Sequence, residues 1–218
     1  MKLTFATVST GNYEGRGKEY TAKLFAGLRA NMPSRVDLRC VCLTDDPGIL
    51  PNGVEAISVP FGPASWWQKL WLFSSGTFTP GERCLYGDLD MIITGDLGDI
   101  AAYAGKFAAL RDPYHFTRMS SSLMAWEAGH LDHVWTKWDE AGRPQFDPQG
   151  DQNWIEAMQP EYDRWQDLLP GQCNSFKSDC WLNGKLPHDT RVLYFHGRPR
   201  PHECKIKFVK DLWNRPTP

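Results

Sequence analysis

The sequence predicts an α/β protein, in which helices flank a Rossmann-like, mixed but mainly parallel β-sheet. Residues 3–9 alternate in polarity, are rich in strand formers and are followed by an apolar helical pattern from Tyr20 to Leu28. Strand-like and helix-like runs then recur along the chain, which is typical of a sheet with covering helices. The chain has 218 residues, of which 41% are hydrophobic and 23% charged, as expected for one domain with a sizeable core.

The later elements follow from the same hydrophobic patterns. Residues 36–43 have apolar side chains on both faces, which indicates a strand buried on both sides. A turn of Asp, Pro and Gly ends that strand, and a short third strand is expected at residues 54–59. Further strands are expected at residues 84–93, 107–110, 120–126 and 192–195, and helices at residues 66–73, 97–103, 131–138, from 150 onward and, with basic residues, 206–213.

Charge and composition restrict the classes of function. The net charge is −2, so the charge of the whole chain favours neither nucleic acid nor an anionic membrane, although a local basic patch stays open. The N-terminus shows no signal-peptide pattern, and no apolar run approaches the roughly 20 residues that span a bilayer. The six cysteines include no C-x-x-C pair, so we expect reduced thiols in a cytoplasmic protein and no zinc site.

The loop after the first strand also excludes two common nucleotide sites. It lacks the G-x-G-x-x-G pattern of NAD and FAD sites, and it lacks the G-x-x-x-x-G-K pattern of a phosphate-binding P-loop. A nucleotide bound at this loop would therefore need a different mode of recognition.

Two aspartates, Asp88 and Asp90, lie within the apolar run of residues 84–93. Buried carboxylates need cations, hydrogen bonds or a metal, because an unpaired buried charge is costly. In a regular strand, side chains two residues apart point to the same face, and strand ends in an open α/β sheet face the ligand crevice. The pair therefore suits a hard cation, Mn²⁺ or Mg²⁺, that also binds diphosphate oxygens; the alternative is a strand end with a polar turn.

Three other segments carry candidate groups. Lys69 lies in an aromatic run, where it either snorkels to the surface or faces phosphates or the acidic pair. Asp151 begins a helix, where aspartate is a common N-cap, so a capping role and a functional role both stay open. After the last strand, His196 precedes Arg198 and Arg200, which prolines hold in place, and the guanidinium fork suits phosphate oxygens.

In this order, the segments resemble the metal-dependent, nucleotide-sugar glycosyltransferases of the GT-A fold. The closest resemblance is to the glycogenin-like and bacterial galactosyltransferases of family eight. Asp88 and Asp90 match the family's D-x-D motif, and residues 150–152 match its central D-Q element. Residues 195–201 are similar to its H-F-x-G-x-x-K-P-W ending, although they are shorter and have Arg200 where the family has Lys.

The resemblance implies a role for each matched residue. A metal ion, Mn²⁺ or Mg²⁺, would be held by Asp88, Asp90 and His196. Asp151 and Gln152 would orient the donor sugar and stabilise positive charge on it, whereas an inverting enzyme would use Asp151 as its base. The nucleotide and diphosphate would be bound by Thr7, Val8, Ser9, Tyr13, Lys69, Asp88, Leu89, Gly197, Arg198 and Arg200.

The implied activity is transfer of a sugar from a nucleotide-sugar donor, expected to be a UDP-sugar, with retention of configuration. Residues 1–218 would form one GT-A-like domain, with a nucleotide-binding half at about 1–95 and an acceptor half at about 96–218. The acceptor stays open among a glycan, a lipid-linked sugar, a protein and a modified nucleobase. Two other hypotheses are a metal-dependent nucleotidyltransferase, although its loop would need a basic residue before Arg16, and a non-catalytic nucleotide- or sugar-binding module.

Overall fold

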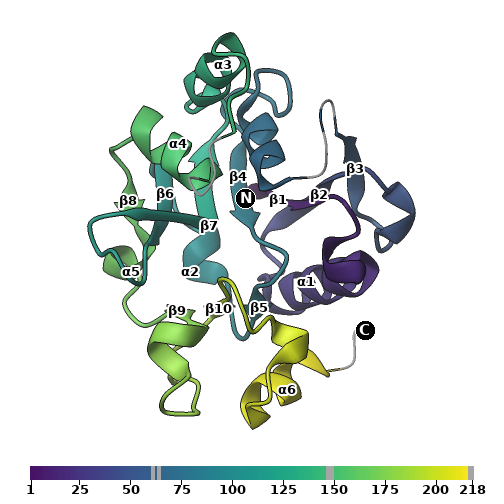
Figure 1. The fold of residues 1–218 in the computed structure, drawn as a ribbon, viewed down its shortest axis with the longest axis vertical. Helices are drawn as coiled ribbons and strands as arrows, with labels where there is room; N and C mark the ends of the chain where they lie inside the picture. Colours follow the sequence, from purple (N-terminus) through teal and green to yellow (C-terminus); the bar gives the residue numbers. More distant parts are fainter. Residues whose placement is uncertain (60–61, 63–64, 146–149, 216–218) are drawn as a thin grey trace.

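A seven-stranded sheet forms the centre of the molecule, and helices lie on both of its faces (Figure 1). The structure, a computed structural model, describes residues 1–59, 62, 65–145 and 150–215. The strand order in the sheet is β3-β2-β1-β4-β7-β6-β8. Its strands are β1 (Lys2–Ser9), β2 (Asp37–Thr44), β3 (Glu55–Ser58), β4 (Arg83–Gly87), β6 (Phe107–Arg111), β7 (Met119–Glu127) and β8 (Asp163–Arg164).

Strand pairing in this sheet is mixed but mainly parallel. β1 pairs in parallel with β2 and β4, and β3 extends the parallel set beyond β2. β7 runs antiparallel between β4 and β6, and β8 is parallel to β6. The predicted fold class is therefore confirmed. The sequence analysis missed β8, because a strand of two residues is too short to produce a periodic pattern.

One helix covers the first face of the sheet close to β1. This helix, α1 (Gly17–Asn31), buries the predicted apolar residues from Tyr20 to Leu28. The ring of Phe25 meets that of Phe5 of β1 edge to face, with 5.9 Å between ring centroids. Alternate residues of β1 face opposite sides of the sheet, so Phe5 joins the core under α1 while Ala6 joins the core on the other side.

The second face is covered by η3 (Trp66–Phe73), α3 (Asp132–Glu140) and α4 (Asp151–Met158). A helix was predicted for the first of these segments, and the structure shows the tighter 3₁₀ form. In a 3₁₀ helix residues three apart lie in one row, so Trp67, Leu70 and Phe73 all enter the core. The predicted helices at α3 and α4 are confirmed.

The acidic segment after β4 differs from the prediction. β4 ends at Gly87, where a Cβ atom would come within 3.0 Å of the Phe5 ring and of the Met91 sulfur. Residues 88–91 then turn, with the Met91 N–H donating to the Asp88 carbonyl at 3.3 Å. The expected strand through both aspartates is therefore wrong, because the chain leaves the central sheet before Asp88. The positions of the two carboxylates depend on a loop and not on strand alternation.

A second, three-stranded sheet receives the chain after this turn. It comprises β5 (Ile92–Ile93), β10 (Val192–Tyr194) and β9 (Cys173–Ser175), with β10 in the middle. The strand predicted at residues 192–195 is confirmed as β10, but its pairing with β5 and β9 in a second sheet was not predicted. The remaining helices are η1 (Tyr13–Gly15), η2 (Pro47–Ile49), α2 (Gly98–Ala101), α5 (Trp165–Leu168), η4 (Phe176–Cys180), η5 (Pro201–Glu203) and α6 (Lys207–Trp213).

Two expectations from composition can be compared with the structure. In the described part of the chain, no helix combines the length and the apolar composition that crossing a bilayer requires. All six cysteines are buried and none forms a disulfide. The thiols therefore belong to the packed interior.

The contact between α1 and β1 gives a test of the core. Phe25 has no exposed surface, so Phe25→Ala removes a ring that its neighbours enclose, and we expect a loss of about 3–5 kcal/mol in the free energy of unfolding. Urea denaturation followed by tryptophan fluorescence measures this loss. Phe116→Ala is the control, because Phe116 is 64% exposed, and a change of more than about 1 kcal/mol there would contradict the assignment.

Candidate active site

A pocket of about 750 Å³ opens where β1 and β4 end. The carboxyl ends of parallel strands meet at one edge of the sheet, and β7, which is antiparallel to β4, begins at that same edge. The pocket is lined by Val8, Thr10, Tyr13, Glu14, Ser65, Trp66, Trp67, Lys69, Tyr86, Asp88, Leu89, Asp90, Ser121, Ser122, Gln145, Asp151, Gln152, Phe195, His196, Gly197 and Arg200.

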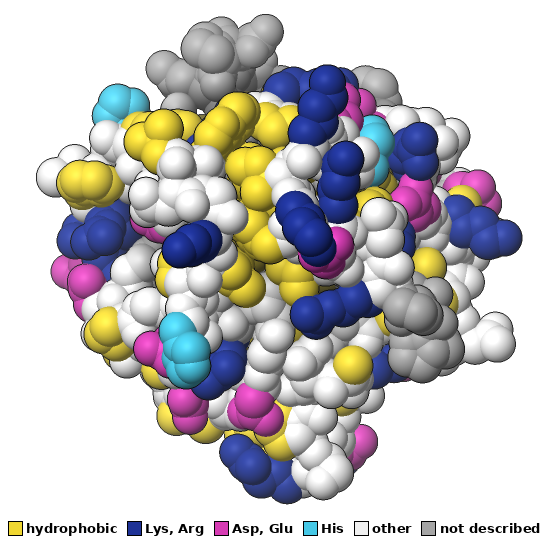
Figure 2. All heavy atoms as spheres, turned by 90° about the horizontal axis from the view of Figure 1, so that it is seen from below, with side chains coloured by type: hydrophobic (Ala, Val, Ile, Leu, Met, Phe, Trp, Pro, Cys, Tyr) yellow, Lys and Arg dark blue, Asp and Glu magenta, His cyan; other side chains and the backbone are white. Residues whose placement is uncertain are grey.

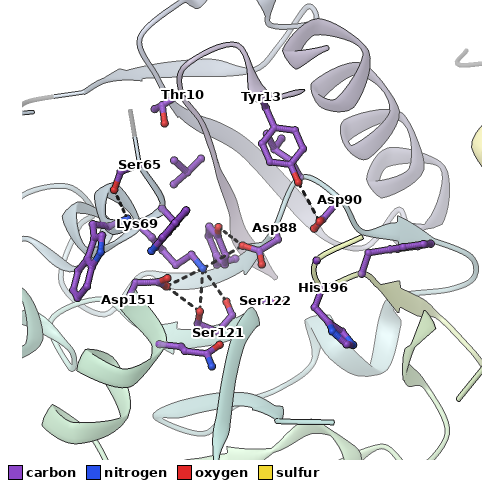
Figure 3. Close-up of a pocket in the computed structure, with 18 of the residues that line it drawn as sticks. Thr10, Tyr13, Ser65, Lys69, Asp88, Asp90, Ser121, Ser122, Asp151 and His196 are labelled. Carbon is purple, nitrogen blue, oxygen red and sulfur yellow. Dashed lines mark hydrogen bonds and ion pairs between the residues drawn. The ribbon is translucent and has the colours of Figure 1, made fainter. Parts of the chain in front are cut away.

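Lys69 lies at the floor of this pocket, between two carboxylates (Figure 3). Its Nζ is 3.0 Å from Asp151 Oδ2 and 3.2 Å from Asp88 Oδ1, and it donates to Ser121 Oγ at 3.0 Å. The Lys69 side chain is only 5% exposed, so it does not snorkel to the surface. Burial opposes its charge, but Asp151 and Asp88 outweigh that effect and raise the pKa of Lys69 above its usual value.

Asp151 is held by side chains and does not cap its own helix. Gly150 is the N-cap of α4, and the Asp151 carboxylate accepts from Ser121 Oγ at 2.9 Å as well as pairing with Lys69. The capping alternative is therefore wrong for this aspartate. Tyr86 completes the group, because its hydroxyl donates to Asp88 Oδ1 at 2.6 Å and its ring lies 4.8 Å from Lys69 Nζ.

Asp90 has a separate cationic partner. Its Oδ2 pairs with the Arg200 guanidinium and accepts from the Tyr13 hydroxyl at 3.1 Å. Asp90 is 3% exposed, and its burial, together with the nearby Asp88 charge, raises its pKa to about 6 despite the opposing effect of Arg200. The buried Nε of Arg200 makes no hydrogen bond within the described residues, and its nearest acid, Glu14, is 3.6 Å away.

His196 lies apart from the two aspartates. Its Nε2 is 2.9 Å from Ser175 Oγ, and its ring meets that of Tyr114 edge to face at 5.1 Å. Figure 3 shows the imidazole turned away from Asp88 and Asp90. Burial and the Lys177 charge lower the pKa of His196, which favours the neutral form of the ring.

The predicted three-residue metal set is therefore not assembled in this structure. Within the described ranges, no three His, Cys, Asp or Glu side chains lie close enough to hold one ion. Asp88 and Asp90 still fit a divalent cation as two hard oxygen ligands. The contacts described above are made by Oδ1 of Asp88 and Oδ2 of Asp90, so the second oxygen of each carboxylate is the one that would bind the ion. The two aspartates thus fit a metal as a pair, and a metal role for His196 would need its ring to turn.

The other predicted residues divide into two groups. Val8, Tyr13, Leu89, Gln152 and Gly197 line the pocket, although their ligand roles stay predictions. The remaining three do not line it: the hydroxyl of Thr7 donates to the Gly87 carbonyl at 2.7 Å, Ser9 is buried, and Arg198 pairs with Glu14 and Glu203 at the surface.

Sequence analysis missed several lining residues. Thr10 lies in the loop that the analysis identified, but Trp66, Tyr86, Ser121 and Ser122 had no assigned role. The run of three serines from Ser120, small hydroxyl residues at the start of a buried strand, was the signal that could have identified the last two. Tyr86 had no such signal, because a tyrosine within an apolar strand is expected to pack in the hydrophobic core.

Comparison with known proteins identifies the fold. No protein-family model and no curated protein matches the chain. The glycosyltransferase GlyE of Streptococcus pneumoniae TIGR4 superposes on 98% of this chain with a TM-score of 0.71 and 13% identity. The galactosyltransferase LgtC, solved with donor and acceptor sugar analogs, superposes on 98% of it with a TM-score of 0.61 and 12% identity. This chain has a GT-A fold.

This chain corresponds to different fractions of the full length of these structures. The chain covers 61% of GlyE and 95% of LgtC. The bifunctional glycosyltransferase WbbM superposes on 97% of this chain with a TM-score of 0.69 and 10% identity, and 49% of WbbM is covered. At these identities the similarity establishes the GT-A architecture that the motifs implied.

The buried lysine gives a test of how the pocket floor is stabilised. Lys69→Met removes a buried cation that contacts both Asp88 and Asp151, so we expect a loss of about 3–5 kcal/mol in the free energy of unfolding, measured with urea. Lys69→Met combined with Asp151→Asn should lose less than the sum of the single losses, because fewer buried charges stay unpaired. Additive effects within about 0.5 kcal/mol would show that the pair is not coupled.

Proposed function

We propose that this protein is a metal-dependent glycosyltransferase that takes a sugar from a nucleotide-sugar donor, a UDP-sugar, and gives it to an acceptor. The observation that carries this proposal is the pocket wall in which two aspartates converge with the buried Lys69 and the partly exposed Arg200. Such a wall suits a diphosphate leaving group on a divalent cation. The GT-A fold, shared with GlyE, WbbM and LgtC, supports it.

The donor's diphosphate would meet Asp90 and Arg200. Asp88 and Asp90 would hold Mn²⁺ or Mg²⁺, which supplies Lewis-acid charge for the departing diphosphate. Arg200, which lines the pocket, would add fixed positive charge beside the phosphate oxygens. Val8, Thr10 and Tyr13 line the part of the pocket nearest β1, where the uridine would lie.

The donor sugar would lie near Asp151 and Gln152, at the N-terminal end of α4. Lys69 and Ser121 both contact Asp151 Oδ2, so this carboxylate is held in one position beside a cation. A carboxylate fixed in this way suits the stabilisation of positive charge on the sugar better than the removal of a proton from an acceptor. We therefore favour retention of configuration over inversion.

The structure does not support the nucleotidyltransferase hypothesis, which needs a basic residue of the first loop to bind phosphate. Arg16, the first basic residue after β1, pairs with Glu19 at 2.7 Å and does not line the pocket. The cations that reach the pocket, Lys69 and Arg200, come from later segments of the chain.

The proposed activity is tested with a panel of nucleotide sugars, with Mn²⁺ present, read as released nucleoside diphosphate. Asp90→Asn should lower the rate about a hundredfold or more, because it removes a charged metal ligand while keeping the side-chain shape. Asp37→Asn is the control, since Asp37 is exposed at the start of β2. Full activity after EDTA treatment, or an unchanged rate in Asp90→Asn, would remove the metal from the mechanism.

A second prediction concerns Arg200, which pairs with Asp90 in the absence of donor and would therefore compete with a metal ion for that carboxylate. Arg200→Ala should weaken UDP binding about tenfold or more through loss of a charged hydrogen bond. The same change should strengthen Mn²⁺ binding to the free protein, because it removes the cation that competes for Asp90. Calorimetry measures both affinities.

Arg198→Ala is the matched control for this experiment. Arg198 is another arginine of the same loop, but it pairs with Glu14 and Glu203 and does not line the pocket. Its loss should leave both affinities unchanged. Equal effects of the two substitutions would show that the loop acts through its overall charge and not through the Arg200 contact.

A further inference from the structure

Charge is distributed very unevenly along this chain. Residues 173–218 contain nine Lys and Arg against four Asp and Glu, a net charge of +5. Residues 1–172 contain 15 against 22, a net charge of −7. The net charge of −2 for the whole chain therefore conceals a basic C-terminal segment.

Four basic residues of this segment, Lys205, Lys207, Lys210 and Arg215, are exposed on or beside α6. The helix buries Val209 and Trp213 and exposes Lys207, Lys210 and Asp211. Lys205, just before the helix, is also exposed. Lys207 pairs with Asp211 at 2.6 Å, whereas neither Lys205 nor Lys210 has an ion pair within the described residues. Figure 2 shows Lys and Arg side chains gathered over this lower face of the molecule.

Exposed apolar side chains lie at the same end of the molecule. The turn after η4 contains Leu182, which is 95% exposed, and Trp181, which is 43% exposed. The Trp181 ring packs against that of Phe176, with 5.4 Å between ring centroids, and this contact positions it beside the turn. The exposed Lys185 follows in the same turn. In Figure 1 the η4 segment and α6 both project from the lower end, which is the face seen in Figure 2.

We propose that the face formed by residues 181–185 and 205–210 binds the surface of an anionic lipid bilayer. Lysines near such a surface are attracted by its negative potential, and a tryptophan with an adjacent leucine suits the boundary between headgroups and acyl chains. A leucine with almost all of its surface in water gains a dry environment by inserting there. This proposal concerns a surface outside the pocket and does not depend on the proposed activity.

Vesicle co-sedimentation of the full chain tests the proposal. One set of vesicles is phosphatidylcholine alone, and the other contains about three parts phosphatidylcholine to one part phosphatidylglycerol. We expect binding to the anionic vesicles at low ionic strength, and its loss at high ionic strength. No binding to anionic vesicles, or equal binding to both kinds, would overturn the proposal. Retention on an immobilised acidic polypeptide without vesicle binding would indicate an acidic protein partner and would overturn it too.

Substitutions identify the face. Lys205→Gln with Lys210→Gln should lower the partition coefficient about 25-fold, at about fivefold per lysine. Leu182→Ser should also lower it, while leaving the salt dependence in place. Lys137→Gln on α3, at the opposite end of the molecule in Figure 1, is the matched control and should bind as the unmodified chain does. A decrease for Lys137→Gln equal to that for Lys210→Gln alone would overturn the assignment of this face.

Release of nucleoside diphosphate from a soluble donor separates this proposal from the proposed activity. The lysine and leucine variants leave the pocket unchanged, so their rates in the absence of vesicles should match that of the unmodified chain. Circular dichroism confirms that each variant is folded, and weak vesicle binding by a folded, active variant supports the proposed face.

Discussion

The buried ammonium group of Lys69 is the interaction on which the pocket depends. It lies between Asp88 and Asp151, and charges removed from water are tolerated only when they are paired and hydrogen bonded. Because these residues belong to η3, to the turn after β4 and to α4, one cation joins three segments that are distant in the sequence. The same contact places an acidic side chain on each side of the space available to a ligand.

A second ion pair in the same pocket joins the loop after β10 to the turn after β4. Arg200, in the loop after β10, pairs with Asp90, whose other contact is the Tyr13 hydroxyl from the loop after β1. Each aspartate of the D-x-D motif therefore has its own cation in the free protein. A divalent ion with a diphosphate would change both pairs together, which couples donor binding in our proposal to a rearrangement of Arg200.

The long elements and the strand that became β10 were predictable, and the pairing of the short strands was not. The period of α1 and the alternation of β1 identify them because each of these elements packs one face on a core. β5, β9 and β10 have two or three residues each, and although a strand was predicted at residues 192–195, the pairing of the three in a second sheet depends on contacts made after the chain folds. The strand expected through Asp88 failed for a related reason: β4 ends at Gly87 and residues 88–91 turn, which the apolar residues on both sides of the aspartates do not reveal.

The sequence by itself determined which chemical groups are present: an acidic pair, a lysine among aromatic residues, a D-Q element and arginines after the last strand. Only the tertiary structure decided their partners. It pairs Lys69 with Asp151, leaves Arg198 at the surface and turns His196 toward Ser175. The physical reason is that a charge buried at a strand end must find an opposite charge within a few ångströms, and which group comes that close depends on how distant loops meet over the sheet.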